Sequence, residues 1–123
     1  MIIHNNLGTL AMSAGDFAAA EEHYRRALAV GNSADASFNL ALAILEKKKW
    51  SAQSIAESMP YLTSAEQQSP YDPDIQAVLG KVYALRGENA AAIKSLERSL
   101  ELGLNPTSAE GARKLLAKLR GAS

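Results

Sequence analysis

The chain has 123 residues, with 13 Lys and Arg against 13 Asp and Glu, so its formal net charge is zero. A chain without net charge has little electrostatic attraction to nucleic acid or to an anionic membrane. The sequence contains no cysteine, which excludes disulfides, thiolate nucleophiles and cysteine-ligated metals.

The first six residues, Met1-Ile2-Ile3-His4-Asn5-Asn6, have neither a basic start nor an apolar core of useful length. They therefore do not resemble a secretory signal peptide. No apolar run approaches the ~18 residues that a membrane-spanning helix needs. We expect a cytoplasmic protein without a membrane span.

The apolar spacing predicts a helix over residues 2–14, with Ile3, Leu7, Leu10, Ala11 and Ala14 on one face. Gly15 is suited to the left-handed position that ends a helix, and Asp16 to the cap of the next one.

The second predicted helix covers residues 17–30, and Gly31-Asn32-Ser33 ends it. Its apolar stripe consists of Phe17, Ala20, Tyr24, Ala27 and Leu28.

The third predicted helix spans residues 34–47, and the fourth is the hardest to place. Proline costs ~3 kcal/mol deep in a helix but little in the first turn. Pro60 therefore predicts that the fourth helix begins near residues 55–58. A helix that began earlier, at Ser51, would be expected to kink at Pro60.

Three more helices complete the prediction, at residues 73–86, 89–102 and 108–120. Asp72 followed by Pro73 is a strong helix start, and Gly87 and Gly103 end the next two helices. Thr107 and Glu110 fit a capping box for the last helix. That helix is amphipathic and is expected to cover the helices before it as a lid.

The same helical pattern recurs along the chain. Leu7-Gly8 returns as Leu79-Gly80, and Leu40-Ala41 stands near the midpoint between them. A unit of about 34 residues therefore occurs three times, and its second copy is about five residues longer.

These residues resemble the tetratricopeptide repeat, a helix-turn-helix unit of about 34 residues. The first copy carries Leu7, Gly8, Gly15, Ala20, Tyr24 and Ala27. The second keeps Leu40, Ala41, Ile44, Leu62, Ala65 and Pro70. The third has Leu79, Gly80, Tyr83, Gly87, Ala92 and Leu96, with Ser99 for the second alanine. The family usually has an aromatic residue one turn before Leu-Gly. The first copy has His4 there and the third has Gln76, and only Phe38 in the second copy keeps the aromatic.

The resemblance implies an all-α fold, a right-handed superhelical α-solenoid of three antiparallel helix pairs with a seventh, capping helix. We expect one domain over residues 1–123. Its repeats would cover about 1–33, 34–71, with an insertion near 48–53, and 72–105, before a capping helix at about 106–120. Because no cap precedes the first helix, an array that continues before Met1 is an alternative.

The family binds extended or helical peptides in a concave groove lined by the first helix of each pair. Carried over, the groove positions here are Asn5, Thr9, Met12, Asp35, Phe38, Asn39, Leu42, Glu46, Asp74, Ala77, Val78 and Lys81. Asn5 and Asn39 would bond a peptide backbone, and Phe38 and Leu42 would take an apolar side chain. Alternatively, the same residues are simply exposed to solvent or make contacts within the array.

One subset of the family clamps the acidic tail of heat-shock chaperones with two lysines, two asparagines and an arginine. The matching positions here are Asn5, Thr9, Asn39, Asp74 and Val78. Only Asn39 agrees, and Asp74 has the wrong sign, so we do not expect a chaperone-tail clamp.

The sequence gives little support for metal binding, nucleic-acid binding or catalysis. His4 and His23 have no second ligand at helical spacing, so no metal is expected. The run Lys47-Lys48-Lys49-Trp50 is explained by the helix dipole more simply than by a nucleic-acid contact. No phosphate loop or nucleophile motif is present, so we predict neither a cofactor nor catalysis.

The resulting prediction is a scaffold that binds a protein or peptide. Assembly or self-association within a larger multi-repeat protein is the alternative. RNA binding is suggested by the unit length alone and is disfavoured by the zero net charge.

Overall fold

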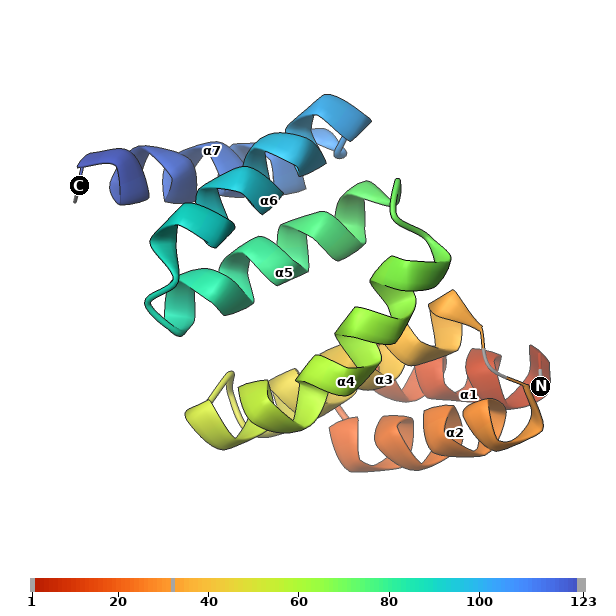
Figure 1. Cartoon of the computed structure of the whole chain (residues 1–123). Helices are drawn as coiled ribbons and strands as arrows, with labels where there is room; N and C mark the ends of the chain where they lie inside the picture. The colour runs from red at the N-terminus through yellow and green to blue at the C-terminus, as the bar shows by residue number, and fades with distance from the viewer. Residues whose placement is uncertain (1, 32, 122–123) are drawn as a thin grey trace. The chain divides into compact units, whose positions relative to one another are not determined.

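The structure is a computed structural model that describes residues 2–31 and 33–121, and the side chains of residues 7–31 and 33–121. Within these residues the chain forms seven α-helices and no strand (Figure 1). The helices are α1 (Ile2–Ser13), α2 (Phe17–Val30), α3 (Ala34–Lys47), α4 (Ala52–Gln68), α5 (Pro73–Leu85), α6 (Asn89–Leu102) and α7 (Pro106–Gly121). The all-α prediction is confirmed.

Helices α2, α3 and α6 begin and end where the sequence predicted. The carboxylate of Asp16 accepts a hydrogen bond of 3.1 Å from the backbone N–H of Ala19. Asp72 accepts one of 2.9 Å from the N–H of Asp74. These are the N-terminal caps that the sequence predicted. Gly15 and Gly103 lie in the left-handed region, with φ of 79° and 99°.

The predicted start of α4 near residues 55–58 is wrong. The helix begins at Ala52, after Ser51, whose hydroxyl oxygen accepts a 3.2 Å hydrogen bond from the N–H of Ser54. Pro60 therefore lies in the helix interior and leaves the carbonyl of Ala56 without an N–H partner. Both residues are exposed, so water can satisfy this carbonyl and the helix continues through the proline.

Helix α7 begins two residues before Ser108, the start that the capping box predicted, and at the first residue of the expected capping helix of about 106–120. The helix begins at Pro106, and the side-chain oxygen of Asn105 accepts a 2.9 Å hydrogen bond from the N–H of Ser108. Proline suits this first helical position because its missing N–H is not needed there. Asn105 thus takes the capping role that the sequence assigned to Thr107.

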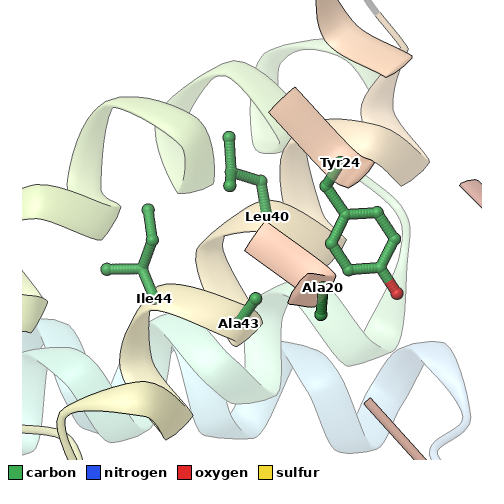
Figure 2. Close-up of a cluster of buried hydrophobic side chains, with 5 residues drawn as sticks. All are labelled: Ala20, Tyr24, Leu40, Ala43 and Ile44. Atoms are coloured by element: carbon green, nitrogen blue, oxygen red, sulfur yellow. The ribbon is translucent and has the colours of Figure 1, made fainter. Parts of the chain in front are cut away.

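The chain divides into two compact units, one made of α1 to α4 and the other of α5 to α7. In the first unit, α1 with α2 and α3 with α4 form antiparallel hairpins, and α2 packs on both α1 and α3 (Figure 1). A buried cluster joins α2 to α3 (Figure 2). It consists of Ala20, Tyr24, Leu40, Ala43 and Ile44. Small side chains at Ala20 and Ala43 let the two helix backbones approach closely.

Two residues of the predicted apolar face of α1 are not buried, and the side chain of Ile3 lies outside the described residues. Leu7 is 40% exposed and Leu10 is 67% exposed, although both lie at the spacing of a core face. Periodicity identifies an apolar face but not whether another helix covers it.

The second unit packs α6 against both α5 and α7. Ala112, Leu116 and Leu119 of α7 are buried on Leu96 of α6. The charged residues of α7 stay exposed, so α7 covers α6 as the sequence predicted. In the part of the chain that the structure describes, no helix has both the length and the apolar character to span a bilayer.

Candidate functional site

Helix α3 has two different faces. Leu40, Ala41 and Leu45 on one side are completely buried. Phe38 and Leu42 lie one turn apart and are only partly buried, as is Asn39, which already has an interaction partner within the chain. The predicted binding residues of α3 therefore lie outside the core, with two apolar side chains on one side of the helix.

The remaining α3 residues of the predicted groove are Asp35 and Glu46. Asp35 is exposed in the first turn of the helix. One carboxylate oxygen of Glu46 accepts a 3.0 Å hydrogen bond from the indole N–H of Trp50. The indole is partly buried, so Trp50 is held against the end of its own helix.

Helix α1 contributes Thr9 and Met12 to the predicted groove, and it contacts α3 within the same unit. The hydroxyl of Thr9 lies 3.2 Å from the hydroxyl of Tyr24. Met12 is partly buried against the cluster of Figure 2. The side chain of Asn5 is outside the described residues. The structure thus places Thr9 and Met12 in the same unit as the α3 residues.

Helix α5 carries the four remaining predicted groove residues, in the other unit. Asp74 and Lys81 are exposed, whereas Ala77 and Val78 are partly buried. Asp74, Val78 and Lys81 follow helical spacing along one side of α5. None of the four belongs to the buried core.

A charged cluster lies on α2. Glu21 pairs with Arg25 at 2.9 Å and Glu22 with Arg26 at 2.6 Å, each four residues apart on the helix. Glu21 also bonds the ammonium of Lys47 on α3, at 3.1 Å. Since Lys47 is 26 residues away in the sequence, helical spacing could not have found this third member.

Arg25 extends the cluster to α4. Its guanidinium donates a 2.9 Å hydrogen bond to the hydroxyl of Tyr61 and lies 5.7 Å from the centre of that ring. Burial alone would lower the pKa of Arg25, but its bonds to Tyr61 and Glu21 outweigh burial and raise that pKa. Burial would likewise raise the pKa of Glu21, but the bonds from Lys47 and Arg25 hold that pKa below its ordinary value.

A shallow surface hollow of about 400 Å³ lies over this cluster. Its walls are Ala18, Glu21, Glu22, Arg25, Arg26, Ala29 and Lys47. Each of its acidic side chains is paired with a basic one. The arrangement ties α2 to α3 and α4, and we assign it to stability.

Two lysines of the run Lys47-Lys48-Lys49 form ion pairs within the chain. Lys47 pairs with Glu21, and Lys48 pairs with Glu57 at 3.4 Å. Among the described residues, no group of three or more His, Cys, Asp or Glu side chains could hold a metal ion.

Comparisons with known proteins identify the repeat. Two family models match the chain, and both describe the tetratricopeptide repeat; one covers residues 5–73 and the other residues 77–110. The search of curated proteins found no match. The first family match alone covers more than half of the chain, and the helix pairs have the expected form. The chain belongs to the tetratricopeptide repeat family.

Proposed function

We propose that this protein binds a peptide or a helix of a partner protein along the first helices of its repeats. Tetratricopeptide repeats generally mediate protein–protein interactions. The family is typically a non-catalytic scaffold, and we propose the same for this chain.

The observation that carries the proposal is the contrast within α3. Its core side is completely buried at Leu40 and Leu45, whereas Phe38 and Leu42 remain partly exposed. Apolar side chains beside an amide such as Asn39 can bury a ligand side chain and bond its backbone. Thr9 and Met12 on α1 would extend the same surface.

We also propose that the three repeats and α7 act as one domain, with repeats at about 1–33, 34–71 and 72–105. The longer second repeat agrees with its helix lengths, because α4 has 17 residues and α2 and α6 have 14 each. Asp74, Ala77, Val78 and Lys81 would then take part in binding from the third repeat. A cytoplasmic location stays a prediction from the sequence.

A comparative pull-down tests the binding surface. The intact chain is compared with a Phe38→Ala, Asn39→Ala variant and with a control, Lys94→Ala, Glu101→Ala, which changes two exposed residues of α6. We expect the wild type and the control to capture a partner equally. The Phe38→Ala, Asn39→Ala variant should lose this partner while its helicity stays unchanged. Equal capture by all three proteins would place the binding surface elsewhere.

Self-association is the alternative function. Sedimentation over a wide concentration range tests it, because a single monomer at high concentration contradicts it.

A further inference from the structure

The side of α3 that lies outside the core carries an acidic residue near each end. Asp35 lies in the first turn of the helix, and Glu46 is its second-last residue. Phe38 and Leu42 lie between them at helical spacing, so the four side chains follow one side of α3. We call these four residues the α3 stripe. At a rise of about 1.5 Å per residue, its two acidic residues are about 16 Å apart along the helix.

Neither acidic residue of the α3 stripe belongs to an ion pair among the described residues. Lys47 and Lys48 follow Glu46 in the sequence, but each already bonds a different carboxylate, at 3.1 Å and 3.4 Å. Lys49 is exposed and is not paired with Glu46 in this part of the chain. The hydrogen bond from Trp50 uses one of the two carboxylate oxygens of Glu46. The stripe therefore keeps a negative charge near each end.

The stability of α3 explains one of these two charges. A carboxylate in the first turn of a helix is favoured by the helix dipole, so Asp35 stabilises α3. Glu46 lies in the last turn, where the dipole disfavours a negative charge. The bond from Trp50 does not require that charge, because the amide oxygen of a glutamine would accept it as well. The charge of Glu46 therefore indicates a positive group that binds from outside the chain.

The neighbouring surface of α1 is neutral in its described part. Helix α1 contacts α3 and supplies Thr9 and Met12 to the predicted groove. It contains no Asp, Glu, Lys or Arg, and the side chain of His4 lies outside the described residues. The acidic, apolar, apolar, acidic order along the α3 stripe is thus the main charge pattern of this surface.

We propose that the α3 stripe binds an amphipathic helix of a partner protein in which two basic residues flank two apolar ones. The proposal rests on the proposed function, because all four stripe residues belong to the predicted groove. Arginine or lysine would pair with Asp35 and with Glu46, and the apolar residues would pack on Phe38 and Leu42.

The spacing of the stripe favours a helix over an extended segment. A partner helix has the same rise per residue as α3, so it meets each stripe residue turn by turn. Side chains on one side of an extended segment repeat every ~6.8 Å, which puts the far basic residue about 4 Å out of register.

A second copy of the chain is a poor source of this helix. Helix α7 carries the most basic residues of the described helices, and they are exposed. Its Leu116 and Leu119, however, are buried against α6. The exposed side of α7 therefore offers basic residues without the two large apolar side chains that the α3 stripe requires.

A designed helical peptide is the probe. It has two arginines eleven positions apart, leucines at the third and seventh positions after the first arginine, and only alanine and glutamine elsewhere. Isolated helices of this length are marginal in water, so a staple on the opposite side holds the peptide helical. In a neutral control peptide, glutamine replaces both arginines, and in an acidic one, glutamate replaces them.

Fluorescence anisotropy measures binding of the three peptides to the full chain and to its variants. We expect wild type to bind the basic peptide at least about tenfold more tightly than the neutral one. Asp35→Asn with Glu46→Gln should lose this preference. Glu101→Gln with Glu110→Gln changes the net charge equally at exposed positions of α6 and α7 and should keep it. Circular dichroism verifies that helicity is unchanged.

Charge reversal is the strictest arm of the experiment. The double variant Asp35→Lys, Glu46→Lys should bind the acidic peptide more tightly than the basic one. A merely structural role of the two acidic residues would weaken binding of all three peptides alike and would not reverse the preference.

Four results would overturn the proposal. The first is equal affinity of wild type for the basic and neutral peptides, and the second is an equal loss in the Glu101→Gln, Glu110→Gln control. The third is no binding of the basic peptide at millimolar concentration. The fourth is a wild-type dimer in sedimentation that Asp35→Asn with Glu46→Gln abolishes, because a second copy would then be the partner.

Phe38→Ala separates this proposal from the proposed function. If the basic and neutral peptides bind wild type equally and Phe38→Ala weakens both, the binding groove stands and the basic partner is wrong. If Phe38→Ala leaves the binding of both peptides unchanged, the peptides bind elsewhere and this proposal fails, while the pull-down still tests the groove with a natural partner.

Discussion

Gly8 lies directly against the ring of Tyr24: a Cβ atom added to Gly8 would come within 2.5 Å of the ring's Cε1. The same relationship recurs in the third repeat, where a Cβ on Gly80 would lie 2.6 Å from Cγ of Leu96. These are the close crossings of the first and third helix pairs. Each crossing depends on the absence of a side chain on one helix.

We therefore expect Gly80→Ala to destabilise the protein. Alanine in a helix interior normally gains up to ~1 kcal/mol over glycine. Overpacking costs ~1–3 kcal/mol, and here the backbone nitrogen of Leu96, 3.3 Å from the added Cβ, limits relaxation. Urea unfolding followed by circular dichroism should show a net loss of up to about 2 kcal/mol.

Gly111 supplies the matched control for this experiment. It lies within α7, and a Cβ added there would meet no atom within 4 Å. Gly111→Ala should therefore raise the free energy of unfolding by roughly 0.5–1 kcal/mol. If both substitutions stabilise the protein to the same extent, the close crossing at Gly80 does not restrict side-chain size.

The turn between α3 and α4 gives a second prediction. Lys49 and Trp50 both have positive φ, 51° and 57°, which is unfavourable for residues with a side chain. We expect Lys49→Gly to raise the free energy of unfolding by about 1 kcal/mol, because glycine adopts this conformation without steric cost. Differential scanning calorimetry or urea titration would measure it.

Lys48→Gly is the control for the turn, since Lys48 has φ of −113°. Glycine relieves no strain there and adds freedom to the unfolded chain, so we expect no gain in stability. An equal gain at both positions would mean that the lysine charges, and not the backbone, limit the stability of this turn.

The sequence predicted those features that depend on neighbouring residues. A cap such as Asp16 and a left-handed residue such as Gly15 depend on the few residues around them. The spacing of Gly8 and Tyr24 depends on residues within one repeat. These local signals were therefore enough to predict most helix ends and the repeat unit. The path of α4 through Pro60 was not predictable, because it depends on whether the freed carbonyl of Ala56 faces water.

The candidate site, too, could be predicted from the sequence only in part. The repeat register alone puts Phe38 and Leu42 on one side of α3, and the structure keeps both outside the core. The links of Glu21 to Lys47 and of Arg25 to Tyr61 join residues 26 and 36 positions apart. Such contacts appear only when the helices are packed, and so does the exposure of Leu10.

Glu21 gives a prediction for pH. Its pKa in the folded protein lies below the ordinary value of 4.5, because the bonds from Lys47 and Arg25 outweigh the effect of burial. Its carboxylate therefore stabilises the fold at pH values above the unfolded pKa. This contribution disappears as the pH falls through the lower, folded-state pKa. Glu21→Gln should lose roughly 0.5–1 kcal/mol at pH 7 and a smaller amount at pH 3.

Urea titrations of wild type and Glu21→Gln at both pH values measure this difference. Glu22→Gln is the control, because Glu22 pairs only with Arg26 among the described ion pairs and is well exposed. The control should change the stability at pH 7 by a smaller amount. A loss for Glu21→Gln that is the same at pH 7 and at pH 3 would contradict the assignment to its ionised form.

The last prediction concerns Ala20, which is completely buried in the cluster between α2 and α3 (Figure 2). Ala20→Leu adds three carbon atoms where the helix backbones approach closely, and it should lower the free energy of unfolding by ~1–3 kcal/mol. Ala18→Leu makes the same change at an exposed position of α2 and should alter stability by less than about 0.5 kcal/mol. Urea unfolding of the two variants compares them directly. If Ala20→Leu is as stable as Ala18→Leu, the helices can separate without cost, and small residues do not set their spacing.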